Sequence, residues 1–528
     1  MMVEGFSSSG LTDELHPEWG PFGVPLFDGP DARALSRVGV IDIGSNSVRL
    51  VVFDGAARSP AYFYNEKILC GLGAGFSETG RLNPEGRIRA LKALKRFATL
   101  TRSMDVSPLV TVATAAVRDA EDGPEFRQEV ADATGLDIKV VDGGEEARLS
   151  AQGVLLGWPG AQGLICDIGG SSMELAELQG GGVVGERRSS DLGPLKLMGI
   201  KGGKKALRAH IKARLADLHQ HFPEKPKRLF LVGGSWRAIA RVDMERRGYP
   251  LKVLHEYIMT PKAILETIKY INQCDMDELR SRTGTSAERM RLVPLASQVL
   301  KELVRTIRPR EVAISSYGIR EGLLYEQMGE QLRHRDPLIE AARHAEASNS
   351  RIPGFGRALF QFVEPLFPRA KHSKKRLIRA ACLLHDVSWR AHPDYRAEVC
   401  FDNATRANLG GLNHPERVYL GLALLHRYKS SRDGTNFDPR LLELLSPPQV
   451  KEAEILGRAM RFAAMLTLEK PMNHAALKLF SKKQKLQLTL KSKDAADLFG
   501  EVAEARFNAL AAAMGCEPHI VYPRKRKS

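Results

Sequence analysis

The sequence predicts a duplicated α/β unit, followed by a helical region and a small strand-and-helix piece at the C-terminus. Three observations support this prediction. Between about residues 38 and 325, β-type runs alternate with helical runs, as is typical of α/β domains. A Gly/Ser-rich motif occurs twice between β-type runs, as D-I-G-S-N-S at residues 42–47 and as D-I-G-G-S-S at residues 167–172. Beyond about residue 333, glycine becomes less frequent and helical periodicity dominates.

The repeated motif predicts two β-hairpins, each with an acidic residue at its mouth. Asp42 and Asp167 end apolar runs, and the glycines and hydroxyls that follow allow a tight turn. Backbone N–H groups and hydroxyls in such turns suit phosphate oxygens. An aspartate that caps its own turn is the simpler alternative, but the duplication favours two phosphate loops facing one cleft. The candidate phosphate-binding residues are Gly44, Ser45, Asn46, Ser47, Gly169, Gly170, Ser171 and Ser172.

Local patterns predict the other elements of this region. Residues 83–103 have helical spacing after an Asn-Pro start, and residues 109–114 and 138–141 are short β-type runs. Residues 142–152 have the pattern of a capped helix start with acidic residues in the first turn. A third Gly-rich turn, at residues 233–235, joins a β-type run to a helix, and taken alone it is best interpreted as a plain strand-to-helix turn.

The C-terminal part has different periodicity. Residues 377–384 and 418–426 have helical spacing, and residues 486–490 alternate as a strand does. We expect one amphipathic helix from about residue 495 to residue 514, and a disordered basic tail at residues 524–527.

Composition shifts along the chain suggest five segments. We expect a flexible leader at residues 1–36, which is rich in serine, glycine and proline. An N-terminal α/β domain at 37–150 and a second at 151–330 follow it. A helical domain at 331–480 and a C-terminal piece at 481–528 complete the prediction.

Charge and cysteine content limit the function. The formal net charge of +16 predicts an anionic partner such as polyphosphate, a nucleotide, nucleic acid or an acidic membrane surface. The six cysteines are far apart and form no C-x-x-C, so they indicate neither a zinc site nor a disulfide framework. There is no apolar run of membrane-spanning length and no signal-peptide pattern. We therefore expect a cytoplasmic protein without a membrane span.

Four segments in this order resemble the exopolyphosphatase/guanosine pentaphosphate phosphatase (Ppx/GppA) family: D-I-G-S-N-S, G-G-E-E-A-R, D-I-G-G-S-S-M-E and G-I-R-E-G. The resemblance covers roughly residues 38–325. It implies an actin/sugar-kinase-like (ribonuclease-H-like) two-domain fold and a homodimer. The region around His385-Asp386 is similar to the family's helical HD-type domain.

The resemblance also implies roles for single residues. Glu146 would be the catalytic base that activates a water, and Arg118 would bind phosphate. Asp167 and Glu174, with Asp42, would hold Mg²⁺, a hard cation suited to carboxylates. From the sequence alone, Glu146 could equally be a solvated first-turn glutamate, and Arg118 an exposed salt-bridging residue.

Two places depart from the family's pattern. Ser171 stands where a third glycine is usual, and Met173 stands where a small or polar residue is usual. Ala115 and Ala116 precede Arg118 where a polar residue is more typical. These departures leave the charged candidates in place and affect substrate preference.

His385-Asp386 suggests a metal site, with His344 as a possible first ligand. A suitable final aspartate is not evident, so we favour a degenerate, non-catalytic HD fold. Lysine-rich residues 371–376 and 478–493 fit either solvated faces or a groove that guides a polyanion.

The predicted function is release of phosphate from the end of inorganic polyphosphate. A guanosine pentaphosphate phosphohydrolase is the first alternative, and a specific nucleic-acid partner is not expected. Other classes are an ATP-dependent kinase of the same fold and a non-catalytic polyphosphate sensor. Catalysis at an HD site is a further option, which requires His385 and Asp386.

Overall fold

The computed structural model describes residues 35, 37–56 and 58–523. The described residues form two compact units, of which the first ends at Pro337 and the second begins at Leu338. Leu35 apart, the expected leader lies outside the described residues, as does the basic tail at 524–527.

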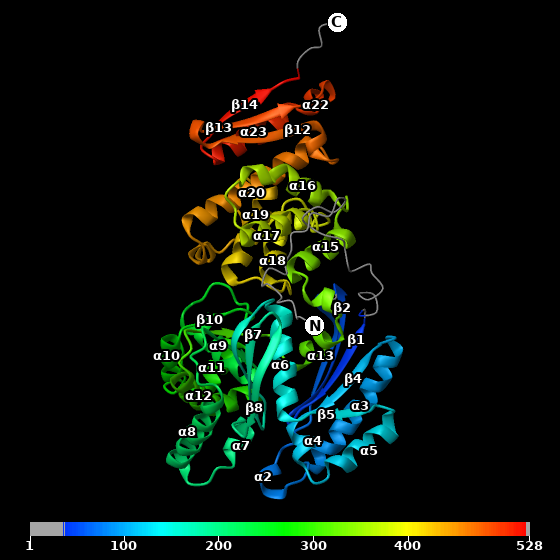
Figure 1. Cartoon of the computed structure of the whole chain (residues 1–528), viewed down its shortest axis with the longest axis vertical. Coiled ribbons are helices and arrows are strands. Elements are labelled where there is room, and N and C mark those ends of the chain that lie inside the picture. The colour runs from blue at the N-terminus through cyan, green and yellow to red at the C-terminus, as the bar shows by residue number, and fades with distance from the viewer. Residues whose placement is uncertain (1–34, 36, 57, 524–528) are drawn as a thin grey trace, which may run out of the picture. The chain divides into compact units, whose positions relative to one another are not determined.

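The first unit begins with a five-stranded mixed sheet in the order β3-β2-β1-β4-β5. Strand β1 is antiparallel to β2 and parallel to β4. Helices α3 and α5 pack against each other beside this sheet (Figure 1). The elements are β1 (Val38–Ile43), β2 (Ser47–Ala56), β3 (Ser59–Leu69), α2 (Phe76–Thr79), α3 (Pro84–Ser103), β4 (Leu109–Ala113), α4 (Ala115–Asp119), α5 (Gly123–Thr134) and β5 (Ile138–Val140).

A second mixed sheet has the order β10-β11-β9-β6-β7-β8. It repeats the start of the first sheet, because β6 is antiparallel to β7 and parallel to β9. Its strands are β6 (Gln162–Ile168), β7 (Met173–Gly180), β8 (Val183–Ser190), β9 (Arg228–Val232), β10 (Ile258–Met259) and β11 (Glu311–Ile314). Its helices are α7 (Pro194–Met198), α8 (Gly203–His221), α9 (Gly234–Arg246), α10 (Pro261–Ile271), α11 (Met276–Thr283) and α12 (Ala287–Ile307).

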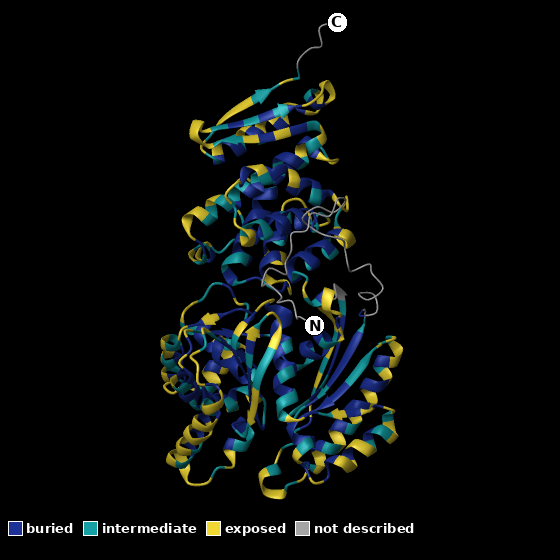
Figure 2. Cartoon of the chain, viewed as in Figure 1, coloured by how far each residue is buried: buried dark blue, intermediate teal, exposed yellow. Residues whose placement is uncertain are grey.

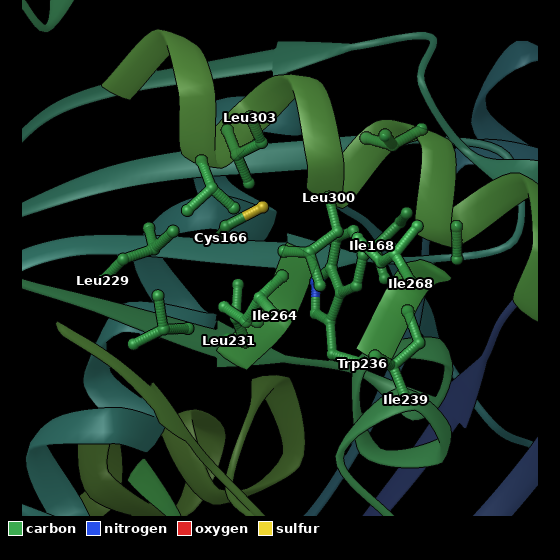
Figure 3. Close-up of a cluster of buried hydrophobic side chains, with 14 of the residues drawn as sticks. Cys166, Ile168, Leu229, Leu231, Trp236, Ile239, Ile264, Ile268, Leu300 and Leu303 are labelled. Carbon is green, nitrogen blue, oxygen red and sulfur yellow. The ribbon is translucent and has the colours of Figure 1, made fainter. Parts of the chain in front are cut away.

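A hydrophobic core lies under the second sheet. Trp236 of α9 is fully buried among Cys166, Ile168 and Leu300, which come from β6 and α12 (Figure 3). Burial of such large apolar side chains is the main source of stability at this point. The packing of Trp236 against β6 places the start of α9 directly behind the end of this strand.

Helix starts in the first unit follow the predicted caps. Asn83 accepts a hydrogen bond from the Gly86 N–H at 2.8 Å, and α3 begins at the next residue, Pro84. Asp142 caps the next long helix, α6 (Gly143–Gly157), by accepting from the Glu145 N–H at 2.7 Å. Both capped starts were predicted from the sequence.

Helix α6 packs against α13 (Ile319–Gln327), and α14 (Glu330–Arg333) follows. The contact between α6 and the start of α13 is made through glycines. A Cβ on Gly153 would lie 2.1 Å from the Gly318 carbonyl oxygen, and one on Gly322 would lie 1.8 Å from the Leu149 carbonyl oxygen. The two backbones therefore touch, and α6 contributes with α13 to a core that also contains residues of both sheets.

The second unit is helical, with a small sheet in the order β12-β13-β14. Its helical part contains α15 (Pro337–Asn349), α16 (Phe355–Val363), η1 (Glu364–Leu366), α17 (His372–Leu384), α18 (Arg396–Arg406), α19 (His414–Tyr428), η2 (Pro439–Leu444), α20 (Pro447–Leu466) and α21 (Pro471–His474). The remainder contains β12 (Ala475–Phe480), η3 (Ser481–Lys483), β13 (Lys485–Leu490), α22 (Lys493–Leu498), α23 (Glu501–Ala513) and β14 (Glu517–Val521).

The single helix expected from residue 495 to residue 514 is wrong. The chain forms two helices, α22 and α23, interrupted at Phe499 and Gly500. Gly500 has an extended backbone and caps α23, because glycine is a poor residue for a helix interior. Phe499 turns inward and packs against Phe462 and Phe507.

The inner strands of both sheets are buried, whereas the outer faces of α3 and α8 are exposed (Figure 2). All six cysteines lie in the described part of the chain and are free thiols. No helix within the described ranges is both long enough and apolar enough to cross a bilayer.

Candidate active site

The two repeated motifs form turns with the same hydrogen bond. In the first turn the Gly44 N–H donates to the Ser47 carbonyl at 3.0 Å. In the second turn the Gly169 N–H donates to the Ser172 carbonyl, also at 3.0 Å. The sequence repeat is therefore a structural repeat.

The acidic residues of the two hairpins occupy matching positions but have different partners. Asp42 stands opposite Arg49 across the first hairpin, and Asp167 stands opposite Glu174 across the second. The first hairpin thus pairs an acid with a base, whereas the second carries two carboxylates.

The tips of the two hairpins meet. The Ser171 hydroxyl donates to the Ser45 hydroxyl at 2.9 Å. A cavity of about 160 Å³ lies between the hairpins. Of the predicted phosphate-binding residues, the cavity is lined by Gly44, Ser45, Gly169, Gly170, Ser171 and Ser172, but not by Asn46 or Ser47. The carbonyl of Asn46 instead accepts from the N–H groups of Cys70 and Gly71.

Glu146, in the first turn of α6, lines the same cavity. It is only 8% exposed, so it is not a solvated surface glutamate. Burial, and then repulsion from Glu174 and Asp167, raise the pKa of Glu146 well above its ordinary value. Its buried Oε2 accepts no hydrogen bond within the described residues and lies 3.7 Å from Nη1 of Arg118. Arg118 also donates to the Val141 carbonyl at 3.2 Å.

Asp167 and Glu174 are fixed by hydroxyl groups. The Ser150 hydroxyl donates to Asp167 Oδ2, and the Ser189 hydroxyl donates to Glu174 Oε1 at 2.9 Å. The other oxygen of Glu174 is buried and finds no partner among the described residues. Burial, and then the charge of Asp167, raise the pKa of Glu174 to about 8.

Two arginines of the cavity were not among the predicted site residues. Arg320 places Nη1 3.7 Å from Oδ2 of Asp42. Arg237 lies four residues after Gly233, in the first turns of α9, and both residues line the cavity. Burial, and then the charges of Arg320 and Arg289, lower the pKa of Arg237 to about 10.

The carboxylates beside this cavity suit a divalent cation. Asp167 and Glu174 face each other, and one buried oxygen of Glu174 has no hydrogen-bond partner within the described residues. A cation there would relieve the repulsion that raises both the Glu174 and the Glu146 pKa. No group of three or more His, Cys, Asp or Glu side chains in the described ranges could hold a metal by itself. Two facing carboxylates are few ligands, and Mg²⁺ is a cation that takes few protein ligands and completes its shell with water and phosphate.

A second and larger cavity of about 790 Å³ shares Arg237 and Ser316 with the first. Its lining is strongly basic, and Glu245 is the one acidic residue among the described residues that line it. Burial, and then repulsion from Arg289, lower the pKa of Lys67. The basic lining residues are Arg49, Lys67, Arg237, Arg241, Lys252, Arg282 and Arg289.

In the second unit, the Asp386 carboxylate is held by a guanidinium group. Arg351 donates to both of its oxygens, at 2.6 and 2.8 Å, and the Tyr428 hydroxyl donates at 3.1 Å. Burial, and then the charge of Arg427, lower the pKa of the neighbouring His385 to about 3, so this imidazole is neutral at pH 7. Arg351 therefore occupies the Asp386 carboxylate, which a metal ion at this site would need as a ligand.

Comparison with known proteins gives a consistent result. Residues 51–331 match the Ppx/GppA phosphatase family, and residues 338–521 match the C-terminal domain of exopolyphosphatases. Exopolyphosphatase 2 of Mycobacterium tuberculosis is 26% identical over 329 residues, which cover 56% of this chain and 100% of the relative. The guanosine-5'-triphosphate,3'-diphosphate pyrophosphatase of Aeromonas hydrophila is 23% identical over 454 residues, covering 81% of this chain and 87% of the relative.

A solved structure shares the fold of the first unit. The crystal structure of an exopolyphosphatase from Cytophaga hutchinsonii aligns with a TM-score of 0.50 at 23% identity and covers 55% of this chain and 97% of that one. The paired hairpins and this likeness define an actin-like two-domain α/β unit. The family match is more specific: the chain belongs to the Ppx/GppA phosphatase family.

Proposed function

We propose that this chain is an exopolyphosphatase, which hydrolyses the terminal phosphoanhydride of inorganic polyphosphate and releases phosphate. The observation that carries the proposal is the small cavity between the two Gly/Ser turns, which is lined by Glu146 and Asp167. Hydrolysis of a phosphoanhydride needs a held phosphate, an oriented water and neutralised charge. The residues around this cavity offer all three.

In the proposed reaction the two turns hold the terminal phosphate through N–H groups and hydroxyls. Glu146 orients the attacking water and accepts its proton. Its raised pKa suits this role, because a carboxylate with higher proton affinity is a better base near neutral pH. Arg118, 3.7 Å from Glu146, would steady this carboxylate and neutralise phosphate charge.

Asp167 and Glu174 would hold Mg²⁺, which when bound neutralises charge on the phosphoryl oxygens. Asp42 was also expected to hold the metal. Its ion pair with Arg320 supports a different role, in which Asp42 orients this arginine toward the substrate.

The larger basic cavity favours polyphosphate as the substrate. It shares Arg237 with the small cavity, so a chain whose end is held between the turns could continue into it. Seven lysines and arginines in its lining suit several successive phosphates. No lining residue that the structure describes is aromatic, so these residues offer no aromatic ring on which a base could stack.

Guanosine pentaphosphate is the second candidate substrate. It is favoured by the match to the Aeromonas hydrophila pyrophosphatase, which covers 81% of this chain, including residues of the second unit. A sensor is less well supported, because binding alone requires no buried glutamate with a raised pKa at the cavity. A kinase would also use a carboxylate base, for the hydroxyl of its acceptor, so the comparison of substrates below separates a kinase from a hydrolase.

For the second unit we propose an HD-type helical domain without metal-dependent catalysis. The ion pair between Arg351 and Asp386 supports this proposal.

We also propose that the chain forms a homodimer, on the basis of the family resemblance. The lysine-rich residues 371–376 and 478–493 would guide the polyanion.

The test compares substrates on one preparation of the full chain. Phosphate release is measured with Mg²⁺ from long-chain polyphosphate, from guanosine pentaphosphate, and from ATP with and without sugar acceptors. We expect the highest kcat/KM for polyphosphate. A higher value for guanosine pentaphosphate would favour the second candidate, and turnover of ATP that depends on an acceptor would favour a kinase.

A further inference from the structure

An ion pair joins the parts of the first unit that carry its two sheets. We call residues 37–56 and 58–140, which contain the first sheet, the first lobe, and residues 162–314, which contain the second sheet, the second lobe. Lys196 of α7 in the second lobe donates at 3.5 Å to Oδ2 of Asp119, the last residue of α4 in the first lobe. Further along the same segment, a Cβ on Gly199 would lie 3.3 Å from the Ser77 hydroxyl of α2, so the end of α7 also lies against the first lobe (Figure 1).

Helix α7 is also attached to the second Gly/Ser turn. The Leu195 N–H donates to the Gly170 carbonyl at 2.8 Å. A Cβ on Gly170 would lie 3.0 Å from Cδ1 of Leu195, so this side chain packs directly on the turn. Lys196 follows Leu195 in the chain, and Gly170 lines the small cavity. The turn that borders the small cavity therefore sets the position of Lys196.

Asp119 connects this contact to Glu146 through Arg118. While Oδ2 of Asp119 accepts from Lys196, its Oδ1 accepts from Nε of Arg118 at 2.9 Å. Nη1 of the same guanidinium group donates to the Val141 carbonyl at 3.2 Å and lies 3.7 Å from Oε2 of Glu146. A continuous series of polar contacts therefore runs from Lys196 in the second lobe to the carboxylate of Glu146.

The contacts of Asp119 are better explained by geometry than by stability. The side chains of Asp119 and Lys196 are 30% and 32% exposed, and ion pairs with that much exposure contribute little to the free energy of unfolding. Consecutive residues of a helix do not face each other, so Asp119 does not meet Arg118 merely because both belong to α4. The contact instead holds the Arg118 guanidinium group in one orientation.

We propose that Asp119 is a positioning residue, which orients Arg118 against Glu146, and that Lys196 of the second lobe holds Asp119 in place. This proposal rests on the roles proposed above for Glu146 and Arg118. Of the four side chains in the series, only Glu146 lines the small cavity, so the other three act on the reaction through it. Glu146 is then correctly held only when the second Gly/Ser turn, to which α7 is attached, is in place.

The test measures phosphate release from polyphosphate by single and combined variants of the full chain. Asp119→Asn should lower kcat by about tenfold with little change in KM, because a misplaced contact to the base affects the transition state more than the binding of the polymer. Lys196→Gln should give a smaller loss of the same kind. Lys196→Arg keeps the charge and the donors, so it should stay close to the wild type.

Combination with Arg118→Gln shows whether Asp119 acts through Arg118. Residues that act as a unit have non-additive effects. In the Arg118→Gln background, neither Asp119→Asn nor Lys196→Gln should lower kcat further. The same loss from Asp119→Asn with and without Arg118 would overturn the proposal.

The matched control is Asp137→Asn, which removes a carboxylate charge from an exposed residue of the first lobe that is paired with Arg127. Its kcat should equal that of the wild type, and its Tm should be close to that of Asp119→Asn. A general charge effect would instead lower the KM for the polyanion in both variants, since each removes one negative charge. Equal kcat values for Asp119→Asn and Asp137→Asn would contradict the positioning role.

These outcomes separate the positioning role from the proposed function. A wild-type chain that releases no phosphate, or full activity in Glu146→Gln, would contradict the proposed function and the positioning role that rests on it. Activity that depends on Glu146 but not on Asp119 would contradict the positioning role alone.

Discussion

Burial beside Asp167 raises the pKa of Glu174 from 4.5 to about 8, so stability should depend on pH through this residue. The folded chain keeps this proton at pH values where the unfolded chain has released it. The stabilising contribution is therefore fully present below about pH 4.5 and is lost as the pH rises through about 8. Glu174→Gln, which imitates the protonated side chain, should match the wild type near pH 4.5 and unfold at a higher temperature at pH 8. Thermal unfolding without metal, followed by circular dichroism across this range, measures the difference.

The control for this variant is Glu177→Gln, which lies on the same strand but does not line the small cavity. It should follow the wild-type pH curve. A Glu174→Gln curve parallel to the wild type throughout would show that Glu174 is not held protonated by its surroundings.

Added Mg²⁺ should act through the same residue. If Asp167 and Glu174 hold the cation, Mg²⁺ should raise the Tm of the wild type at pH 8, since it binds the folded chain and stabilises the ionised carboxylates. Glu174→Gln should lose most of this gain. An equal Mg²⁺ effect in both proteins would place the cation elsewhere.

At the scale of elements, the crossing of α6 and α13 sets the position of Glu146. Gly322→Ala would place a Cβ 1.8 Å from the Leu149 carbonyl, so the helices must separate. We expect a loss of about 1–3 kcal/mol in the free energy of unfolding, together with lower activity, because α6 carries Glu146. Chemical denaturation and phosphate release measure both effects.

Gly329→Ala is the matched control in the same unit. A Cβ at Gly329 has no neighbour within 4 Å, and its φ of −61° suits alanine. Equal free energies of unfolding for Gly322→Ala and Gly329→Ala would show that α6 and α13 can separate without a loss of stability.

The elements that the sequence predicted are those specified by local chemistry. The hairpins around Asp42 and Asp167 were predictable because their Gly/Ser turns repeat, and the start of α6 was predictable because Asp142 is a good cap.

The cavity arginines were not predicted, because tertiary packing brings them there. Arg237 had a usable signal, since it stands one helical turn after a Gly-rich turn, whereas Arg320 lay in a motif used only for the resemblance. The break between α22 and α23 was missed because Gly500 interrupts an otherwise helical pattern.

At the scale of the whole molecule, the +16 net charge is concentrated in part around the large cavity of the first unit. If this cavity holds polyphosphate, Arg289→Gln should raise the KM for the polymer by about three- to tenfold, the effect of losing one phosphate contact, with a smaller change in kcat. The dependence of kcat/KM on salt should also become less steep. Steady-state kinetics at several salt concentrations test both expectations.

Arg310→Gln is the control, because Arg310 is an exposed arginine of the first unit that does not line either cavity. Equal KM values for Arg289→Gln and Arg310→Gln would mean that general charge, and not this cavity, attracts the substrate.

The most direct test of the account is Mg²⁺-dependent phosphate release from polyphosphate by Glu146→Gln and Glu145→Gln. The two glutamates are neighbours in the first turn of α6, but Glu145 is paired with Arg148 and does not line the cavity. If Glu146 is the base, Glu146→Gln should lose about a hundredfold or more of kcat, and Glu145→Gln should stay within a few-fold of the wild type. Full activity in Glu146→Gln, or equal losses in both variants, would contradict the proposed mechanism.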